Sequence, residues 1–239
     1  MDTNDPFATH LPSPTAARPL LGLTVLVVED SRFACEAMRL LCLRSGARIR
    51  RADCLRSARR HLQVYRPTIV VVDLGLPDGN GIDLISELAV SQPKVEAVLA
   101  MSGDLYLQND AIAAGADGFL AKPVTSIAGF QEMVLSLLPA ERQPRGPRVL
   151  DNSMVMPDRI ALQDDMAHIA DVLDDPPDAH ALDYAAQFLS GVARSANDRP
   201  LEDAANALAA KRALGEAAAS ETAMLAGMIQ HRLADKIAI

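Results

Sequence analysis

Aromatic residues are scarce in this chain of 239 residues: they make up 3% of it, and tryptophan is absent. Hydrophobic residues still reach 49%, so the interior is predicted to be aliphatic, filled by Ala, Val, Leu and Ile. No apolar run approaches the roughly 20 residues that a membrane-spanning helix needs. The first 20 residues lack the apolar segment of a signal peptide and are predicted to be a flexible lead-in. These absences predict a cytoplasmic protein with no membrane partner.

Cysteine is also rare, and its spacing does not suggest a metal site. Cys35, Cys42 and Cys54 are an odd number without metal-ligand spacing. The first two lie seven residues apart on one face of a predicted helix, as expected for reduced core residues.

The net charge of −8 argues against non-specific binding to nucleic acid.

Short apolar segments alternate with helical patterns over the first 140 residues. The predicted strands are residues 23–28, 47–52, 68–73, 95–101 and 118–121. The predicted helices are residues 32–44, 55–65, 82–90, 105–114 and 126–138. Five such strand–helix units predict an α/β doubly wound fold of the flavodoxin type, with a five-stranded parallel sheet.

Polar residues stand at the carboxyl ends of four of these strands. They are Glu29 with Asp30, then Asp73, Ser102 and Lys122. Right-handed crossovers bring the carboxyl ends of parallel strands to one edge of the sheet, where open α/β sheets bind their ligands. We therefore expect these side chains to form one site.

The residue types in this group suit phosphoryl chemistry. Clustered carboxylates bind a hard cation such as Mg²⁺, which accepts few protein oxygens and keeps several waters. With its neighbours neutralised by the metal, Asp73 can act as a nucleophile toward a phosphoryl group. Lys122 and Ser102 would then stabilise charge on the phosphoryl oxygens.

Three segments carry a resemblance to a known family. VLVVED at residues 25–30, VDLGLPDG at 72–79 and GADGFLAKP at 115–123 resemble the receiver domains of two-component response regulators, and the likeness covers about residues 22–138. The resemblance implies that Asp73 accepts a phosphoryl group from a phosphohistidine on a sensor histidine kinase or a histidine phosphotransfer protein. It implies only this self-phosphorylation and autodephosphorylation, with no dedicated catalytic domain.

The same resemblance implies a role for each site residue. Asp30 and Asp73 would bind Mg²⁺ directly, Glu29 through a water, and Gly75 through its carbonyl oxygen. The family's switch positions are occupied by Ser102 and Phe119, while Lys122 would pair with the phosphoryl group.

Two features depart from the commoner pattern of the family. Phe119 lacks the hydroxyl of the more usual tyrosine, so switching must depend on packing of its ring. Gly75 and Gly103 leave the phosphoryl site little covered by side chains, which predicts easy access of water and a short phosphoryl lifetime.

The rest of the chain is predicted to be helical. We divide the chain into a lead-in at 1–20, a receiver domain at 21–139, a Pro-rich linker at 140–150 and a helical module at 151–239. Helices are predicted at 158–173, 178–196, 198–214 and 217–236, with residues 174–177 ending the first. A small Ala-rich module of this kind is predicted to form a homodimer that buries its apolar stripes.

Three outputs stay open for the module. The favoured one is dimerisation or binding of a protein partner, controlled through the face formed by the fourth helix, fifth strand and fifth helix. Binding of DNA or RNA, as in transcriptional or antiterminator regulators, is disfavoured because no basic recognition helix is present. A phosphate sink without its own output is the third. His168, His180 and His231 lack the Lys-Gly that follows the histidine of phosphotransfer domains.

Overall fold

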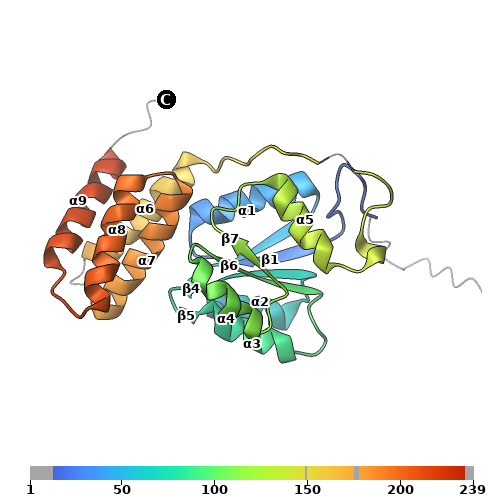
Figure 1. Cartoon of the computed structure of the whole chain (residues 1–239), viewed down its shortest axis with the longest axis horizontal. Helices are drawn as coiled ribbons and strands as arrows, with labels where there is room; N and C mark the ends of the chain where they lie inside the picture. Colours follow the sequence, from blue (N-terminus) through green and yellow to red (C-terminus); the bar gives the residue numbers. More distant parts are fainter. Residues whose placement is uncertain (1–12, 149, 175–177, 235–239) are drawn as a thin grey trace, which may run out of the picture.

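A computed structural model describes residues 13–148, 150–174 and 178–234 of the chain. It has an α/β part and a bundle of helices that lie side by side (Figure 1). The two are joined by residues 143–158, here called the strap, whose described residues run along one side of the α/β part. No helix in the described residues is both long enough and apolar enough to cross a membrane.

The α/β part is built on a five-stranded parallel sheet, which confirms the predicted fold class. Its strands are β1 (Thr24–Val28), β2 (Arg48–Ala52), β3 (Ile69–Asp73), β6 (Ala97–Ser102) and β7 (Gly118–Ala121). They lie in the order β2-β1-β3-β6-β7, and every neighbouring pair is parallel. The order reverses between β1 and β3, where folds of this type place their ligands.

Helices cover both faces of this sheet. Its helices are α1 (Arg32–Ser45), α2 (Leu55–Val64), α3 (Gly81–Val90), α4 (Gln108–Ala113) and α5 (Ile127–Leu137). Successive strand residues point to opposite faces, so Val25 and Val27 join a core with α1 and α5, while Leu26 and Val28 join a second core with α2 and α3. Apolar burial on both faces explains why β1, β3 and β6 are almost continuously hydrophobic. The edge strand β2 is instead rich in Arg and largely exposed.

Two loops contain structure that the sequence patterns do not indicate. After β3, the short strands β4 (Gly75–Leu76) and β5 (Gly79–Asn80) pair as a hairpin. The helix expected at 105–114 is shorter, because a 3₁₀ turn, η1 (Leu105–Leu107), precedes α4. The Asp104 side chain accepts the amide N–H of Tyr106 and so fixes this turn. A second 3₁₀ turn, η2 (Ala140–Arg142), follows α5.

Segments on either side of the α/β part are tied to it. Residues 1–12 of the lead-in lie outside the described residues, but Leu20 is fully buried in the core and donates its N–H to Ser45. Beyond the Pro-rich segment, Met154 pairs with Ser126, and Val155 is buried against the α1 and α5 core. The strap therefore holds the start of the bundle beside the sheet.

The bundle is all-helical, as predicted. Its helices are α6 (Arg159–Asp174), α7 (Ala179–Ser195), α8 (Arg199–Ala213) and α9 (Ala219–Ala234). Asp178 caps the start of α7 and Asp198 that of α8. Leu, Ile, Val and many Ala side chains form a third core between the four helices. The stop predicted at Pro176 and Pro177 and the predicted end at Lys236 lie outside the described residues.

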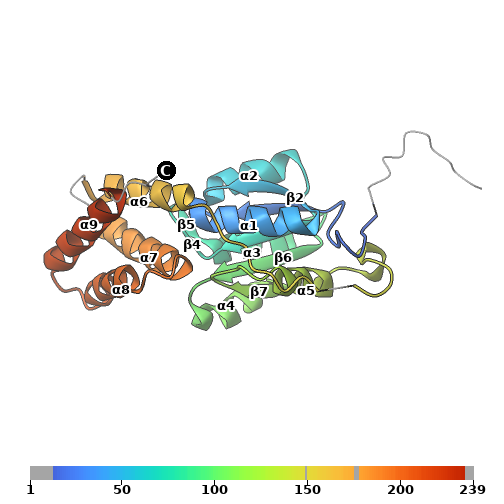
Figure 2. The ribbon, with the colours of Figure 1, turned by 90° about the horizontal axis from the view of Figure 1, so that it is seen from above.

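The bundle packs against the carboxyl edge of the sheet, through contacts of α6 and α7 with α1 and of α7 with β4 (Figure 2). The sequence-based expectation was that the module would be read out at the face of α4, β7 and α5. The docked module contacts α1 and β4 instead, because the strap carries the chain past α5 before α6 begins. A response of the α4, β7 and α5 face to phosphorylation stays a prediction. The apolar stripes also largely bury one another within a single chain.

Candidate functional site

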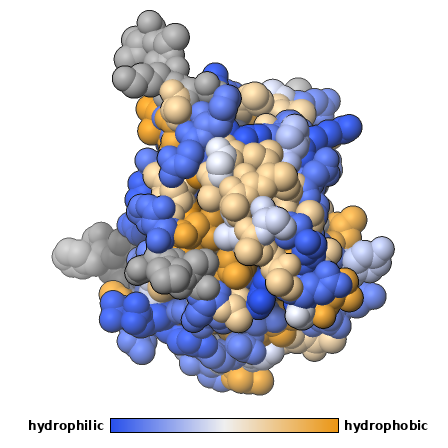
Figure 3. Space-filling model, turned by 90° about the vertical axis from the view of Figure 1, so that its left-hand side faces the viewer, coloured by the Kyte–Doolittle hydropathy of each residue, from blue (hydrophilic) through white to orange (hydrophobic). Residues whose placement is uncertain are grey.

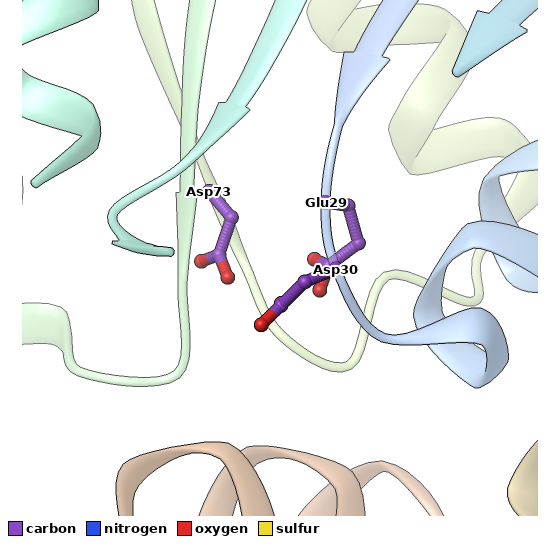
Figure 4. A group of neighbouring side chains, drawn as sticks. All are labelled: Glu29, Asp30 and Asp73. Carbon is purple, nitrogen blue, oxygen red and sulfur yellow. The ribbon is translucent and has the colours of Figure 1, made fainter. Parts of the chain in front are cut away.

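Three carboxylates meet at the carboxyl edge of the sheet (Figure 4). Glu29 and Asp30 directly follow β1, and Asp73 is the last residue of β3, the neighbouring strand. One oxygen from each side chain lies within 4.8 Å of the other two. Glu29 and Asp73 are 1% and 6% exposed. The parallel pairing of β1 with β3 therefore places acids that are distant in sequence in one buried cluster.

Lys122 supplies the counter-charge. It follows β7, and its Nζ lies 2.6 Å from Glu29 Oε2 and 3.0 Å from Asp73 Oδ2. Burial alone would lower the pKa of Lys122, but the carboxylates of Asp73 and Glu29 raise it. The ammonium therefore stays charged beside the two acids.

Burial also perturbs the acids themselves. Desolvation raises the pKa of Asp73 to about 7, with a further rise from Glu29 that Lys122 opposes. It raises the pKa of Glu29 to about 7 and that of Asp30 to about 6. Three carboxylates with one ammonium are thus poorly stabilised as anions, and an added cation would relieve their repulsion.

The donor set fits Mg²⁺, because all its side-chain ligands are carboxylate oxygens and the site opens to a cavity that can hold water. A bound Mg²⁺ would neutralise the acids and stabilise charge on phosphoryl oxygens. Gly75 lies in β4, directly beyond Asp73 and Leu74, and lines the same cavity.

The two predicted switch residues differ in position. Ser102, the last residue of β6, is 6% exposed, lines the cavity and accepts the amide N–H of Asp104 at 3.1 Å. Phe119 lies on β7 and belongs to the core beside α4. The structure thus brings Glu29, Asp30, Asp73, Gly75, Ser102 and Lys122 to one cavity, and places Phe119 behind it.

A side of this site comes from the helical bundle. A cavity of about 760 Å³ separates the acidic cluster from α7, whose Gln187, Ser190 and Arg194 line the opposite wall. Gln187 occupies the space where a Cβ atom at Gly75 would lie, and Arg194 donates a hydrogen bond to the Gly103 carbonyl. The expectation that both glycines leave the site uncovered is therefore wrong: side chains of α7 fill those places.

Two further contacts hold the bundle at the site. The Tyr184 hydroxyl on α7 donates to Asp30 Oδ2 at 2.7 Å. Asp165 on α6 is 2% exposed and accepts the Ser31 hydroxyl at 2.7 Å and the amide N–H groups of Arg32 and Phe33 at 2.7 and 3.0 Å. Anions are stabilised at helix N-termini, and Asp165 sits at the start of α1.

Four site residues were not predicted from the sequence: Asp165, Tyr184, Gln187 and Arg194. One signal was available for two of them. Asp165 follows Leu162 by three residues and precedes Ile169 by four, so an acid falls on the apolar face of its helix. Tyr184 similarly precedes Phe188 by four residues. A polar group on a buried stripe indicates a contact outside the bundle's own core.

The parallel sheet, the acidic cluster and the adjacent ammonium all lie within one segment of the chain. Residues 25–133 match the family model of the response regulator receiver domain. This part of the chain is a response regulator receiver domain of the kind found in two-component systems, as its resemblance to that family predicted. The matched residues end before the helical bundle begins.

Curated relatives resemble the same part of the chain. It is 32% identical over 99 residues to the KDP operon transcriptional regulatory protein KdpE of Escherichia coli, covering 41% of this chain and 44% of that protein. It is 34% identical over 107 residues to the transcriptional regulatory protein CitB of Klebsiella pneumoniae, covering 43% and 45%. The chain thus aligns with less than half the length of each.

Solved receiver structures also align with this region. A receiver domain from Methylobacillus flagellatus is 26% identical, with a TM-score of 0.44, and the alignment covers 48% of this chain and 98% of that one. The response regulator TrrA of Thermotoga maritima, solved in complex with Mg²⁺-BeF, is 20% identical with a TM-score of 0.44, covering 48% and 99%.

Proposed function

We propose that this protein is a response regulator whose Asp73 accepts a phosphoryl group from phosphohistidine on a sensor kinase or phosphotransfer protein. The observation that carries the proposal is the position of Asp73, 3.0 Å from the Lys122 ammonium and within 4.8 Å of two further carboxylates, in a domain of the receiver family. A buried nucleophile beside a cation and a metal-binding cluster suits phosphoryl transfer.

Each site residue has a part in this proposal. Asp30 and Asp73 would bind Mg²⁺ directly, with Glu29 acting through water and Gly75 through its carbonyl oxygen. Lys122 and the Ser102 hydroxyl would stabilise the phosphoryl oxygens. Ser102 and Phe119 would respond to phosphorylation by moving the segment between β6 and α4. The buried position of Phe119 supports a response through packing.

Control of the helical bundle is the proposed output. In the docked arrangement, Tyr184 holds Asp30 and α7 faces Asp73 across the cavity. A phosphoryl group on Asp73 would add charge and volume on that side and shift the bundle toward an undocked state. The freed bundle would then bind a second copy or another protein.

The outer end of the bundle supports an assembly role. Figure 3 views this end of the molecule and shows hydrophobic residues interspersed with hydrophilic ones. Leu214 and Met224 are 73% and 50% exposed. Apolar residues at this end would be available to a partner, and so would the sides of α6 and α7 that undocking uncovers.

A transcriptional output is the second candidate, because the curated relatives KdpE and CitB are named transcriptional regulators. Against it, Arg194, Lys211 and Arg212 each pair with an acidic side chain of the bundle. Binding to DNA or RNA that weakens steeply with salt would favour this candidate. A phosphate sink would instead show phosphorylation without a change in assembly or binding.

Size-exclusion chromatography with light scattering tests the proposal. The full chain is compared in Mg²⁺ alone and in Mg²⁺ with beryllofluoride, which mimics the aspartyl phosphate, and Asp73→Asn is the control. We expect a change in mass or hydrodynamic radius that requires Asp73. No change in either quantity would contradict an output through assembly or undocking.

A further inference from the structure

The receiver side of the cavity is bare at two positions, and α7 supplies the missing side chains. A Cβ atom at Gly75 would overlap the Gln187 amide, and one at Gly103 would lie 2.8 Å from Arg194 Nη1. Gly75 lies two residues beyond Asp73, and Gly103 directly follows Ser102. The bundle therefore completes the wall around the acceptor carboxylate.

Among the polar α7 side chains that line the cavity, Gln187 differs in its hydrogen bonding. The Ser190 hydroxyl donates to Asn206 Oδ1 at 2.8 Å, and that of Ser195 donates to the Gly191 carbonyl. Arg194 is held by Glu202 and by the Gly103 carbonyl. Within the described residues, the Gln187 amide has no hydrogen-bond partner. Its oxygen and its two N–H groups are free to bind water or a phosphoryl oxygen.

The cavity between Gln187 and Asp73 has room for both a phosphoryl group and water. Its volume of about 760 Å³ is many times the roughly 30 Å³ that one water occupies in the liquid. Lys122, on the receiver side, would hold the phosphoryl oxygens, so the side facing α7 is the open direction for an attacking water. Gln187 stands on that side.

We propose that Gln187 orients the water that hydrolyses the aspartyl phosphate, so that the helical module limits the lifetime of its own signal. This inference rests on the proposed phosphorylation of Asp73. The amide oxygen accepts a hydrogen bond from the water, and an amide N–H donates to a phosphoryl oxygen. Positioning a water in this way is an established means of accelerating phosphoryl transfer.

The hydrolysis balances without a further reactant. The water oxygen forms a bond to phosphorus as the bond between phosphorus and the Asp73 carboxylate oxygen breaks. The carboxylate is regenerated, and both water protons leave with the phosphate as dihydrogen phosphate, which then equilibrates with solvent. In the proposed exchange between docked and undocked states, Gln187 acts only when the module closes again over the phosphorylated site.

The test compares dephosphorylation rates in the full chain. Wild-type protein, Gln187→Ala and the matched control Gln230→Ala, on the exposed side of α9, are labelled with radioactive acetyl phosphate in Mg²⁺. Excess donor is removed and loss of label is followed. We expect Gln187→Ala to lose label roughly ten- to a hundredfold more slowly than wild type, as when one positioned hydrogen-bonding group is removed. Gln230→Ala should match wild type.

A hydrogen-exchange measurement and two further variants distinguish a positioning role of Gln187 from a structural one. Hydrogen exchange of the Arg32 and Phe33 amides, which are bonded to Asp165, reports whether each variant stays docked. Gly75→Ala keeps the Gln187 amide but displaces it, so this variant should also lose label slowly. A conservative Gln187→Asn, with the same groups on a shorter stem, should restore part of the rate.

Loss of label at the wild-type rate, or faster, in a docked Gln187→Ala would overturn the inference while leaving phosphorylation of Asp73 intact. A rise in rate would mean that Gln187 shields the phosphoryl group from water. Failure of the wild-type chain to take up label at Asp73, judged against Asp73→Asn, would instead overturn the proposed function and this inference with it.

Discussion

Tyr184 of the helical bundle donates a hydrogen bond of 2.7 Å to Asp30, one of the three clustered acids of the receiver domain. The two residues are 154 positions apart in the chain. Burial, followed by the nearby Asp30 carboxylate, raises the pKa of Tyr184, so its hydroxyl stays protonated and remains a donor. In the proposed mechanism this contact couples the occupancy of the acidic site to the position of α7.

Replacing Tyr184 by Phe should favour the undocked state. A hydrogen bond to a charged group contributes about 1.5–3 kcal/mol, and Phe keeps the ring while removing the donor. We expect Tyr184→Phe to take up phosphoryl from acetyl phosphate several-fold faster than wild type, and then to lose it more slowly because Gln187 is less often at the site. The control is Tyr65→Phe, because the Tyr65 hydroxyl has no hydrogen-bond partner among the residues that the structure describes. Equal uptake rates for both variants would count against the coupling.

Asp165 should be the main polar anchor of α6. Its buried carboxylate accepts three hydrogen bonds at the start of α1, and the amide nitrogen of an Asn in its place could accept none. Each buried donor left without a partner costs about 1–3 kcal/mol. Asp165→Asn should therefore undock the bundle, with faster proteolysis of the strap at residues 143–158.

Asp164→Asn offers a neighbouring comparison for that experiment. Asp164 pairs with Arg32 at 2.7 Å, but its side chain is 43% exposed. Exposed ion pairs contribute about 0–1 kcal/mol, so this variant should resist proteolysis as wild type does. Similar cleavage of the two variants would argue that Asp165 is no anchor.

The effects of Gly75→Ala and Gln187→Ala on the rate of aspartyl phosphate hydrolysis should not be additive. The first change moves the Gln187 amide aside and the second removes it, so both eliminate one interaction. The double variant should hydrolyse its aspartyl phosphate at the rate of Gln187→Ala alone. Multiplicative slowing in the double variant would show that Gly75 acts by a route independent of Gln187.

Much of the receiver fold could be predicted because local and global signals agree in it. Strands buried on both faces read as continuous apolar runs, and acids or Lys at their ends were brought together by the parallel topology. Asp104 shows the limit, because it caps a 3₁₀ turn over the first residues of the expected helix, so α4 begins only at Gln108. Apolar periodicity does not register this local competition.

The composite site could not be predicted, since it depends on how two parts of the chain dock. Gln187 and Arg194 reach the site because Val155 of the strap is buried beside α5 and Asp165 holds α6 at the start of α1. The sequence shows that Gly75 and Gly103 have no side chains of their own, but the side chains that fill those places are set by packing between distant segments. Asp165 and Tyr184 offered a weak signal as polar residues on apolar helix faces.

The most direct measurement is hydrogen–deuterium exchange of the full chain in Mg²⁺, with and without beryllofluoride, for wild type and Asp73→Asn. The account predicts faster exchange at the Arg32 and Phe33 amides when beryllofluoride is added to wild type, since undocking removes Asp165 from them. Asp73→Asn should show no such change. Unaltered exchange at these amides in wild-type protein that binds beryllofluoride would contradict the claim that the state of Asp73 controls the helical module.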